Sequence, residues 1–150
     1  MDVNWDAPAV ARSEAEIAAD PETVWEVLTD LERWPSWNPD VSSVTVEGGL
    51  GEGTVFRWKA GRSTITSTIR EVDRPRRIGW TGTTTGIDAV HVWRLEPRDG
   101  GGTLVRTEES WQGLLVRLLR GPMRKSLQKA VDGGLGHLKA EVERRARARG

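Results

Sequence analysis

The stretch PMRKSLQKAVDGGLGHLKAEVERRAR, residues 122–147, decides the fold. Its apolar residues recur at spacings of three and four, and they are Met123, Leu127, Val131, Leu135, Leu138 and Val142. That spacing is the period of one face of an α-helix. Pro122 suits the first turn of such a helix, which would be about 39 Å long. A helix with one apolar stripe needs a partner surface that buries the stripe.

The C-terminal helical region extends from residue 113 to residue 149. Four leucines open it, Leu114, Leu115, Leu118 and Leu119, and we expect Gly121-Pro122 to break it. Gly133, Gly134 and Gly136 interrupt the long helix, at a cost of about 1 kcal/mol each relative to Ala. Two interpretations of these glycines stay open. They either make room for a ligand or a bend, or they allow the helix to pack closely on its partner.

The partner surface is predicted to be a sheet, because seven stretches alternate or are rich in Thr, Val, Ile and Trp. They span residues 10–19, 41–47, 54–60, 63–72, 76–82, 87–96 and 103–111. Short connections between successive strands indicate antiparallel hairpins. The sequence therefore predicts one α+β domain over residues 1–150, with a seven-stranded antiparallel sheet wrapped around the C-terminal helix.

Two short helices are expected after the first strand. Asp20 is a typical N-cap and Pro21 a typical first-turn residue, so a helix should begin there. A second short helix is expected over Leu31–Trp34, ended by Pro35. Residues 1–8 are expected to form a loose tail.

Composition narrows the class of protein. The chain has 22 basic and 22 acidic residues, which is no signature of nucleic-acid binding. It has no cysteine, and we expect a cytoplasmic protein without a signal peptide or stable membrane insertion. Arginines at 144, 145, 147 and 149 suit a solvated helix end, with phosphate or membrane contact as the alternative. Eight Trp residues, against one Phe and no Tyr, predict a bulky core or an aromatic-lined cavity.

Several motifs resemble the START/Bet v 1-like (SRPBCC) superfamily, and within it the polyketide cyclase/dehydrase-like group. They are DPETVWEVLTD at 20–30, WPSWNP at 34–39, EVDRPRRI at 71–78, and LEP at 95–97 with Gly102-Thr103. The resemblance covers about residues 9–147. It implies a helix-grip fold whose sheet and long helix enclose a cavity for a lipid, sterol, polyketide or other hydrophobic molecule.

Alternation along the strands nominates the residues of that cavity. In the strand 87–96, the resemblance favours the set with Ala89, His91 and Trp93 as the concave face. The expected ligand-binding residues are Trp34, Trp37, Asn38, Phe56, Trp58, Ile78, Trp80, Ala89, His91, Trp93, Val105, Thr107, Met123, Leu127, Val131 and Leu135. Trp34, Trp37 and Asn38 are expected near the mouth. The alternative is that these residues simply fill a core.

His91 is the candidate catalytic acid–base, because imidazole titrates near neutrality. The alternative is a histidine satisfied by one hydrogen bond in an apolar wall. Glu109, Thr107 and Arg57 are expected to partner His91 only if bulges turn them inward. No metal site or cofactor is expected, since the two histidines lie far apart and carboxylates do not cluster.

Three functions follow from these patterns. The first is a carrier or sensor that binds a hydrophobic, ring-containing small molecule. The second is a cyclase, aromatase or dehydratase that acts on a polyketide-like substrate with His91 as the base. The third and weakest is a protein-interaction module. The absence of Tyr weakens the second, because related cyclases resemble one another in using polar pocket side chains that include Tyr or Arg.

Overall fold

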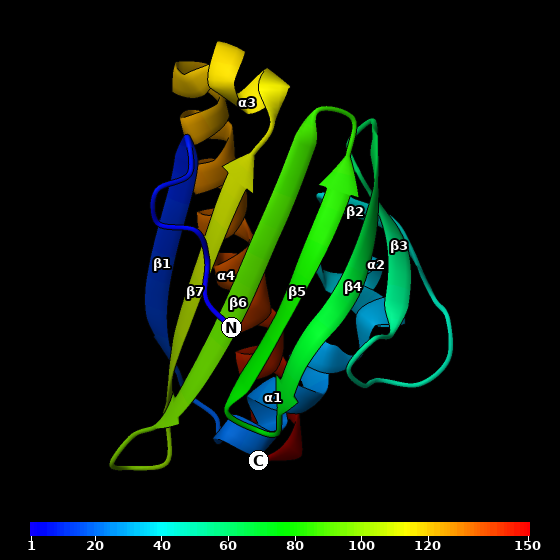
Figure 1. The fold of residues 1–150 in the computed structure, drawn as a ribbon. Helices are drawn as coiled ribbons and strands as arrows, with labels where there is room; N and C mark the ends of the chain where they lie inside the picture. The colour runs from blue at the N-terminus through cyan, green and yellow to red at the C-terminus, as the bar shows by residue number, and fades with distance from the viewer.

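The computed structural model describes residues 1–150, which form one sheet and four α-helices (Figure 1). The strands are β1 (Ala9–Ile17), β2 (Val41–Val46), β3 (Val55–Ala60), β4 (Ser63–Asp73), β5 (Arg77–Thr84), β6 (Ile87–Pro97) and β7 (Thr103–Gln112). The helices are α1 (Pro21–Thr29), α2 (Trp34–Trp37), α3 (Leu114–Leu118) and α4 (Arg120–Arg149), with a 3-10 turn at Leu31–Arg33.

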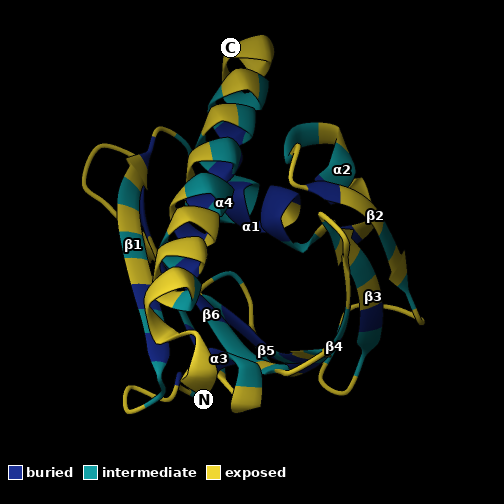
Figure 2. Ribbon diagram, turned by 90° about the horizontal axis from the view of Figure 1, so that it is seen from above, coloured by how far each residue is buried: buried dark blue, intermediate teal, exposed yellow.

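All seven strands pair antiparallel in the order β1-β7-β6-β5-β4-β3-β2. The sheet curls so that its concave face holds α4 on one side and α1 and α2 on the other (Figure 2). The expected helix-grip architecture is confirmed. Each strand begins and ends within two residues of its predicted bounds, because turn residues between the strands mark their ends.

The helices after β1 agree with the prediction in part. Asp20 caps α1, where its Oδ1 accepts a hydrogen bond from the Thr23 backbone N at 2.8 Å. The expectation that Pro35 ends the second helix is wrong, because Pro35 lies in the first turn of α2. Proline is tolerated there since the N–H groups of the first turn have no partner within the helix.

The long helix α4 begins two residues earlier than predicted and runs without interruption past Gly133, Gly134 and Gly136 to Arg149. Its predicted stripe is buried at Leu127, Val131, Leu135, Leu138 and Val142. The break before it lies at Leu119 rather than at Gly121-Pro122, which form part of the first turn of α4. In α3, Val116 is the buried residue.

The core has two parts along α4. The N-terminal part packs on β1, where Leu127, Val131 and Val116 contact Ala9 and Ala11. The larger part joins Leu135, Leu138 and Val142 to α1 and to the middle of the sheet. The helix therefore lies over the β1–β7 side of the concave face.

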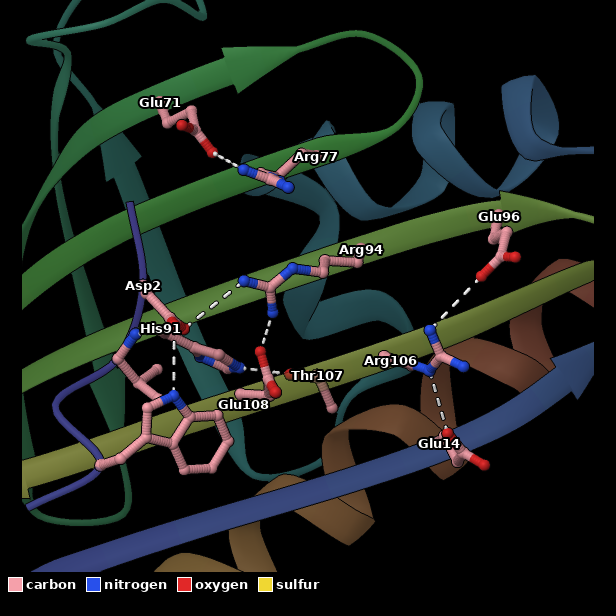
Figure 3. A network of polar contacts seen from close by, with 12 residues as sticks. Asp2, Glu14, Glu71, Arg77, His91, Arg94, Glu96, Arg106, Thr107 and Glu108 are labelled. Carbon is pink, nitrogen blue, oxygen red and sulfur yellow. Dashed lines mark hydrogen bonds and ion pairs between the residues drawn. The ribbon is translucent and has the colours of Figure 1, made fainter.

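Residues 1–8 were expected to form a loose tail but lie against the convex face of the sheet (Figure 3). Val3 is buried, and the Asn4 backbone N donates to Ser110 Oγ at 3.0 Å. Asp2 contacts Arg94, which also pairs with Glu108. Arginines and carboxylates cover this face in pairs, so the apolar interior of the fold lies on the other face.

Replacing Leu127 tests this packing. Leu127 is fully buried, so Leu127→Ala should lower the free energy of unfolding by about 2–5 kcal/mol, because it leaves a cavity. Chemical denaturation measures the change. Leu50→Ala, in an exposed loop, is the control and should change stability by less than about 0.5 kcal/mol. Equal effects of the two substitutions would mean that the α4 stripe does not pack as described.

Candidate functional site

A cavity of about 270 Å³ lies between the concave face of the sheet, α2 and the middle of α4. Thirteen of its 23 lining residues are hydrophobic, and six of the eight Trp residues are among them. These are Trp34, Trp37, Trp58, Trp80, Trp93 and Trp111. The other two lie elsewhere, since Trp25 is in the core and Trp5 is exposed. The unusual Trp content of the chain is therefore gathered around one cavity.

Strand alternation directs these side chains inward. On β6, the residues Ile87, Ala89, His91 and Trp93 all line the cavity. The antiparallel register places Trp111 beside Ala89 and Glu109 beside His91 on the neighbouring strand β7. Directly opposed residues of a strand pair point to the same face of the sheet.

The aromatic rings form a continuous chain of contacts. Trp34 lies against Trp58 and Trp80, with ring centroids 5.6 Å away in each case. Trp80 lies 5.1 Å from the His91 ring, and His91 lies 5.3 Å from Trp93. These separations are in the range of favourable edge-to-face and tilted aromatic packing, so the rings hold one another in place.

Both nitrogens of His91 have protein partners. Nε2 lies 2.7 Å from Thr107 Oγ1 and Nδ1 lies 3.3 Å from Glu109 Oε1. The expectation that bulges must turn Thr107 and Glu109 inward is wrong, because the β6–β7 register is regular throughout. Arg57 is no partner of His91 and pairs with Glu47 instead.

Burial lowers the pKa of His91 below its ordinary value of 6.5, and the nearby Glu109 carboxylate raises it in part. Burial disfavours the imidazolium because it removes water from the charged form. The neutral ring matches its neighbours. The Thr107 hydroxyl donates to Nε2, and Nδ1–H lies beside the Glu109 carboxylate.

Three of the six cavity indoles have hydrogen-bond acceptors, and two of the others have buried N–H groups without one. Trp34 Nε1 donates to the Leu28 carbonyl at 2.9 Å, Trp58 Nε1 to Ser67 Oγ at 3.1 Å, and Trp111 Nε1 to Glu109 Oε2 at 2.9 Å. The indole N–H groups of Trp37 and Trp93 are buried without an acceptor. A buried donor without a partner costs free energy, so these two indoles are held in place by ring packing rather than by hydrogen bonds.

The structure brings half of the expected site residues together. Trp34, Trp37, Asn38, Trp58, Trp80, Ala89, His91 and Trp93 line the cavity. Phe56, Ile78, Val105 and Thr107 do not, since they are fully buried on the inward face of their strands but outside the cavity. Alternation identifies the face of a strand, but it does not tell how deep along that face the cavity reaches.

The expected helix wall needs correction. Met123, Leu127, Val131 and Leu135 do not line the cavity, and Ala130 and Gly134 do. The apolar stripe of α4 packs on the sheet. The cavity borders the neighbouring strip of the helix surface, where Ala130 and Gly134 lie one turn apart. An added Cβ at Gly134 would meet nothing within 4 Å, so close packing does not require this glycine.

Trp111 and Glu109 were missed as cavity residues. The signal was present, because both share the alternation of β7 with Thr107. Ala130 and Gly134 carry no such signal, since small residues in a polar stretch do not differ from a solvated helix surface.

Chemistry in the cavity is limited to a few groups. Asp40, Glu109 and the neutral His91 are the ionisable side chains on its wall, and no Lys or Arg lines it. No group of three or more His, Asp or Glu residues has the geometry of a metal site. No helix is both long and apolar enough to cross a bilayer.

Comparison with known proteins finds a match to one family. The model of the polyketide cyclase/dehydrase and lipid transport family matches residues 8–143. No curated protein matches the sequence.

Solved structures share the fold. A hypothetical protein from Helicobacter pylori is 16% identical with a TM-score of 0.83, covering 95% of this chain and 96% of its own. A protein from Thermus thermophilus is 26% identical with a TM-score of 0.77, covering 89% and 96%. The Zhui aromatase/cyclase from a Streptomyces species is 22% identical with a TM-score of 0.83, covering 94% and 97%.

The lowered pKa of His91 predicts a pH effect on stability. The unfolded chain binds a proton near pH 6.5 while the folded chain does not, so stability should fall as the pH drops below about 6.5. Denaturation between about pH 7.5 and about pH 5.5 measures this loss. His91→Asn should remove part of the pH dependence. A profile identical to that of the unchanged protein would mean that His91 titrates alike in both states.

Proposed function

The chain belongs to the polyketide cyclase/dehydrase and lipid transport family, and from that premise we propose that it binds a hydrophobic, ring-containing small molecule in its cavity. The observation that carries the proposal is the set of six indoles around one space. Such rings offer broad dispersion contact to a planar ligand. A largely apolar cavity with few polar groups is typical of a ligand site.

The volume indicates the size of the ligand. A cavity of about 150 Å³ holds one benzene ring. The cavity here, at about 270 Å³, has room for about two rings. A compact bicyclic ligand therefore suits it better than a long acyl chain.

The charges on the wall indicate a neutral ligand rather than an anion. Asp40 and Glu109 line the cavity, and no Lys or Arg is present to neutralise a bound carboxylate. A buried anion without a cationic partner is strongly disfavoured.

The state of His91 favours binding over catalysis. A general base needs a lone pair within reach of the substrate proton. The neutral ring accepts from Thr107 at Nε2, and Nδ1 lies 3.3 Å from the Glu109 carboxylate, so both nitrogens face protein groups. Thr107 itself is fully buried and does not line the cavity.

A cyclase-type enzyme is the second candidate. One observation favours it, which is the pairing of His91 with a carboxylate on the cavity wall. Movement of Thr107 away from Nε2 would turn this pair into a base oriented by Glu109. In that case His91→Ala would bind substrate but lose about 10²–10⁴-fold in turnover, whereas a carrier would keep most of its affinity and have no turnover to lose.

Calorimetric titration with matched naphthalene probes tests the proposal. We expect 2-naphthol to bind saturably and 2-naphthoate to bind at least about tenfold more weakly, because the carboxylate is unpaired in the cavity. Equal affinity of both probes, or tighter binding of 2-naphthoate, would contradict the neutral-ligand proposal.

Two helix glycines provide a matched pair of variants. Gly134 lines the cavity and Gly136 is exposed, and an added Cβ meets open space at both. Gly134→Trp should fill the cavity and lower 2-naphthol affinity by about tenfold or more, whereas Gly136→Trp should bind like the unchanged protein. Circular dichroism would check that both variants fold. Equal affinities of the two variants would place the probe outside the cavity.

A further inference from the structure

Outside the cavity, the segment formed by α3 and the first turns of α4 combines exposed leucines with basic side chains. We define it as the α3 patch, which consists of Leu114, Leu118, Leu119, Arg117, Arg120, Arg124, Lys125 and Lys129. Leu114 and Leu118 are each 71% exposed and Leu119 is 44% exposed. Three of the five large exposed hydrophobic residues of the chain thus lie within six residues of one another.

The fold holds these leucines outward. Val116 anchors α3 in the core, and Leu115 packs against Gly86 in the β5–β6 turn. Leu114 and Leu118 are four residues apart and share the opposite face of the helix. Gly113 fixes the start of α3, since its φ is +122° and a Cβ there would lie 2.5 Å from the Gly86 carbonyl oxygen.

The basic residues of the patch are unneutralised. Between residues 113 and 131 there are five Lys or Arg and no Asp or Glu. All five are exposed, and none forms an ion pair. By contrast, Arg94 and Arg106 on the convex face are paired with carboxylates (Figure 3).

The patch borders the cavity. The β5–β6 turn on which α3 rests is flanked by Thr84 and Ile87, which both line the cavity. A surface that covers the patch would therefore lie beside the cavity.

We propose that the α3 patch docks the protein on an anionic phospholipid surface. The leucines would enter the boundary between headgroups and acyl chains, and the five cations would lie among the phosphates. Apolar side chains flanked by Lys and Arg are the pattern of interfacial membrane binding. Each cation near an anionic leaflet adds attraction that salt screens.

The leucines distinguish a lipid surface from other anionic partners. Nucleic acid attracts the basic residues through its phosphates, but exposed leucines gain nothing from a phosphate backbone. On a bilayer, the same leucines leave water, which is favourable.

Vesicle co-sedimentation tests the proposal with phosphatidylcholine vesicles and with vesicles that also contain phosphatidylglycerol. We expect binding to the mixed vesicles, and we expect it to weaken as salt rises. Arg117→Glu with Arg120→Glu should reduce partitioning by about tenfold or more. Leu114→Ser with Leu118→Ser should also reduce it by about tenfold or more.

Matched controls come from elsewhere on the chain. Leu50→Ser replaces an exposed leucine outside the patch, and Arg147→Glu with Arg149→Glu reverses charges at the far end of α4. Both controls should partition within about threefold of the unchanged protein. Gly134→Trp should also keep vesicle binding, so that failure of docking and failure of ligand binding are distinguishable.

Three results would overturn the proposal. The first is no binding to the mixed vesicles by protein that is folded by circular dichroism. The second is binding that the leucine double variant retains in full. The third is binding to a DNA duplex with no binding to vesicles, which would make the patch a nucleic-acid surface.

Discussion

The packing of the α4 stripe on the β1–β7 side of the sheet determines where everything else can lie. Leu127 and Val131 reach Ala9 and Ala11 there, so the helix covers only part of the concave face. α1 and α2 cover a second part, and the surface between them stays uncovered by backbone (Figure 2). The cavity occupies this remaining space. Its size therefore depends on a helix that is held to one side of the sheet by its own apolar residues.

Small residues on the helix side and mutually packed rings on the sheet side together keep the cavity open. Ala130 and Gly134 place almost no side-chain volume on the helix side, at the cost of helix propensity at Gly134. On the sheet side, the Trp rings hold one another through edge contacts, and His91 is fixed by Thr107 and Glu109. Rings that brace one another in this way need no ligand to stay in position.

The sequence predicted the fold far better than the site. Period two in the strands and period 3.6 in α4 identify faces, and faces suffice to assemble a sheet on a helix. Alternation does not indicate how far along a face the cavity extends. Phe56 and Trp58 share one alternation, yet only Trp58 reaches the cavity. Leu127 and Gly134 lie on one helix, yet the apolar residue packs on the sheet and the glycine borders the cavity, because a ligand space occurs where packing is incomplete.

The pairing of β1 with β7 has a consequence for biosynthesis. Residues 9–17 find their partners at residues 103–111, and Leu127 and Val131, which cover Ala9 and Ala11, come later still. Closing a loop of this length costs entropy before any contact repays it, and such non-local pairings fold slowly. As a ribosome makes the chain, β1 must wait with its inward face uncovered until the C-terminal third has emerged. The domain is thus completed only after α4 has been made, and until then the inward face of β1 stays exposed to water.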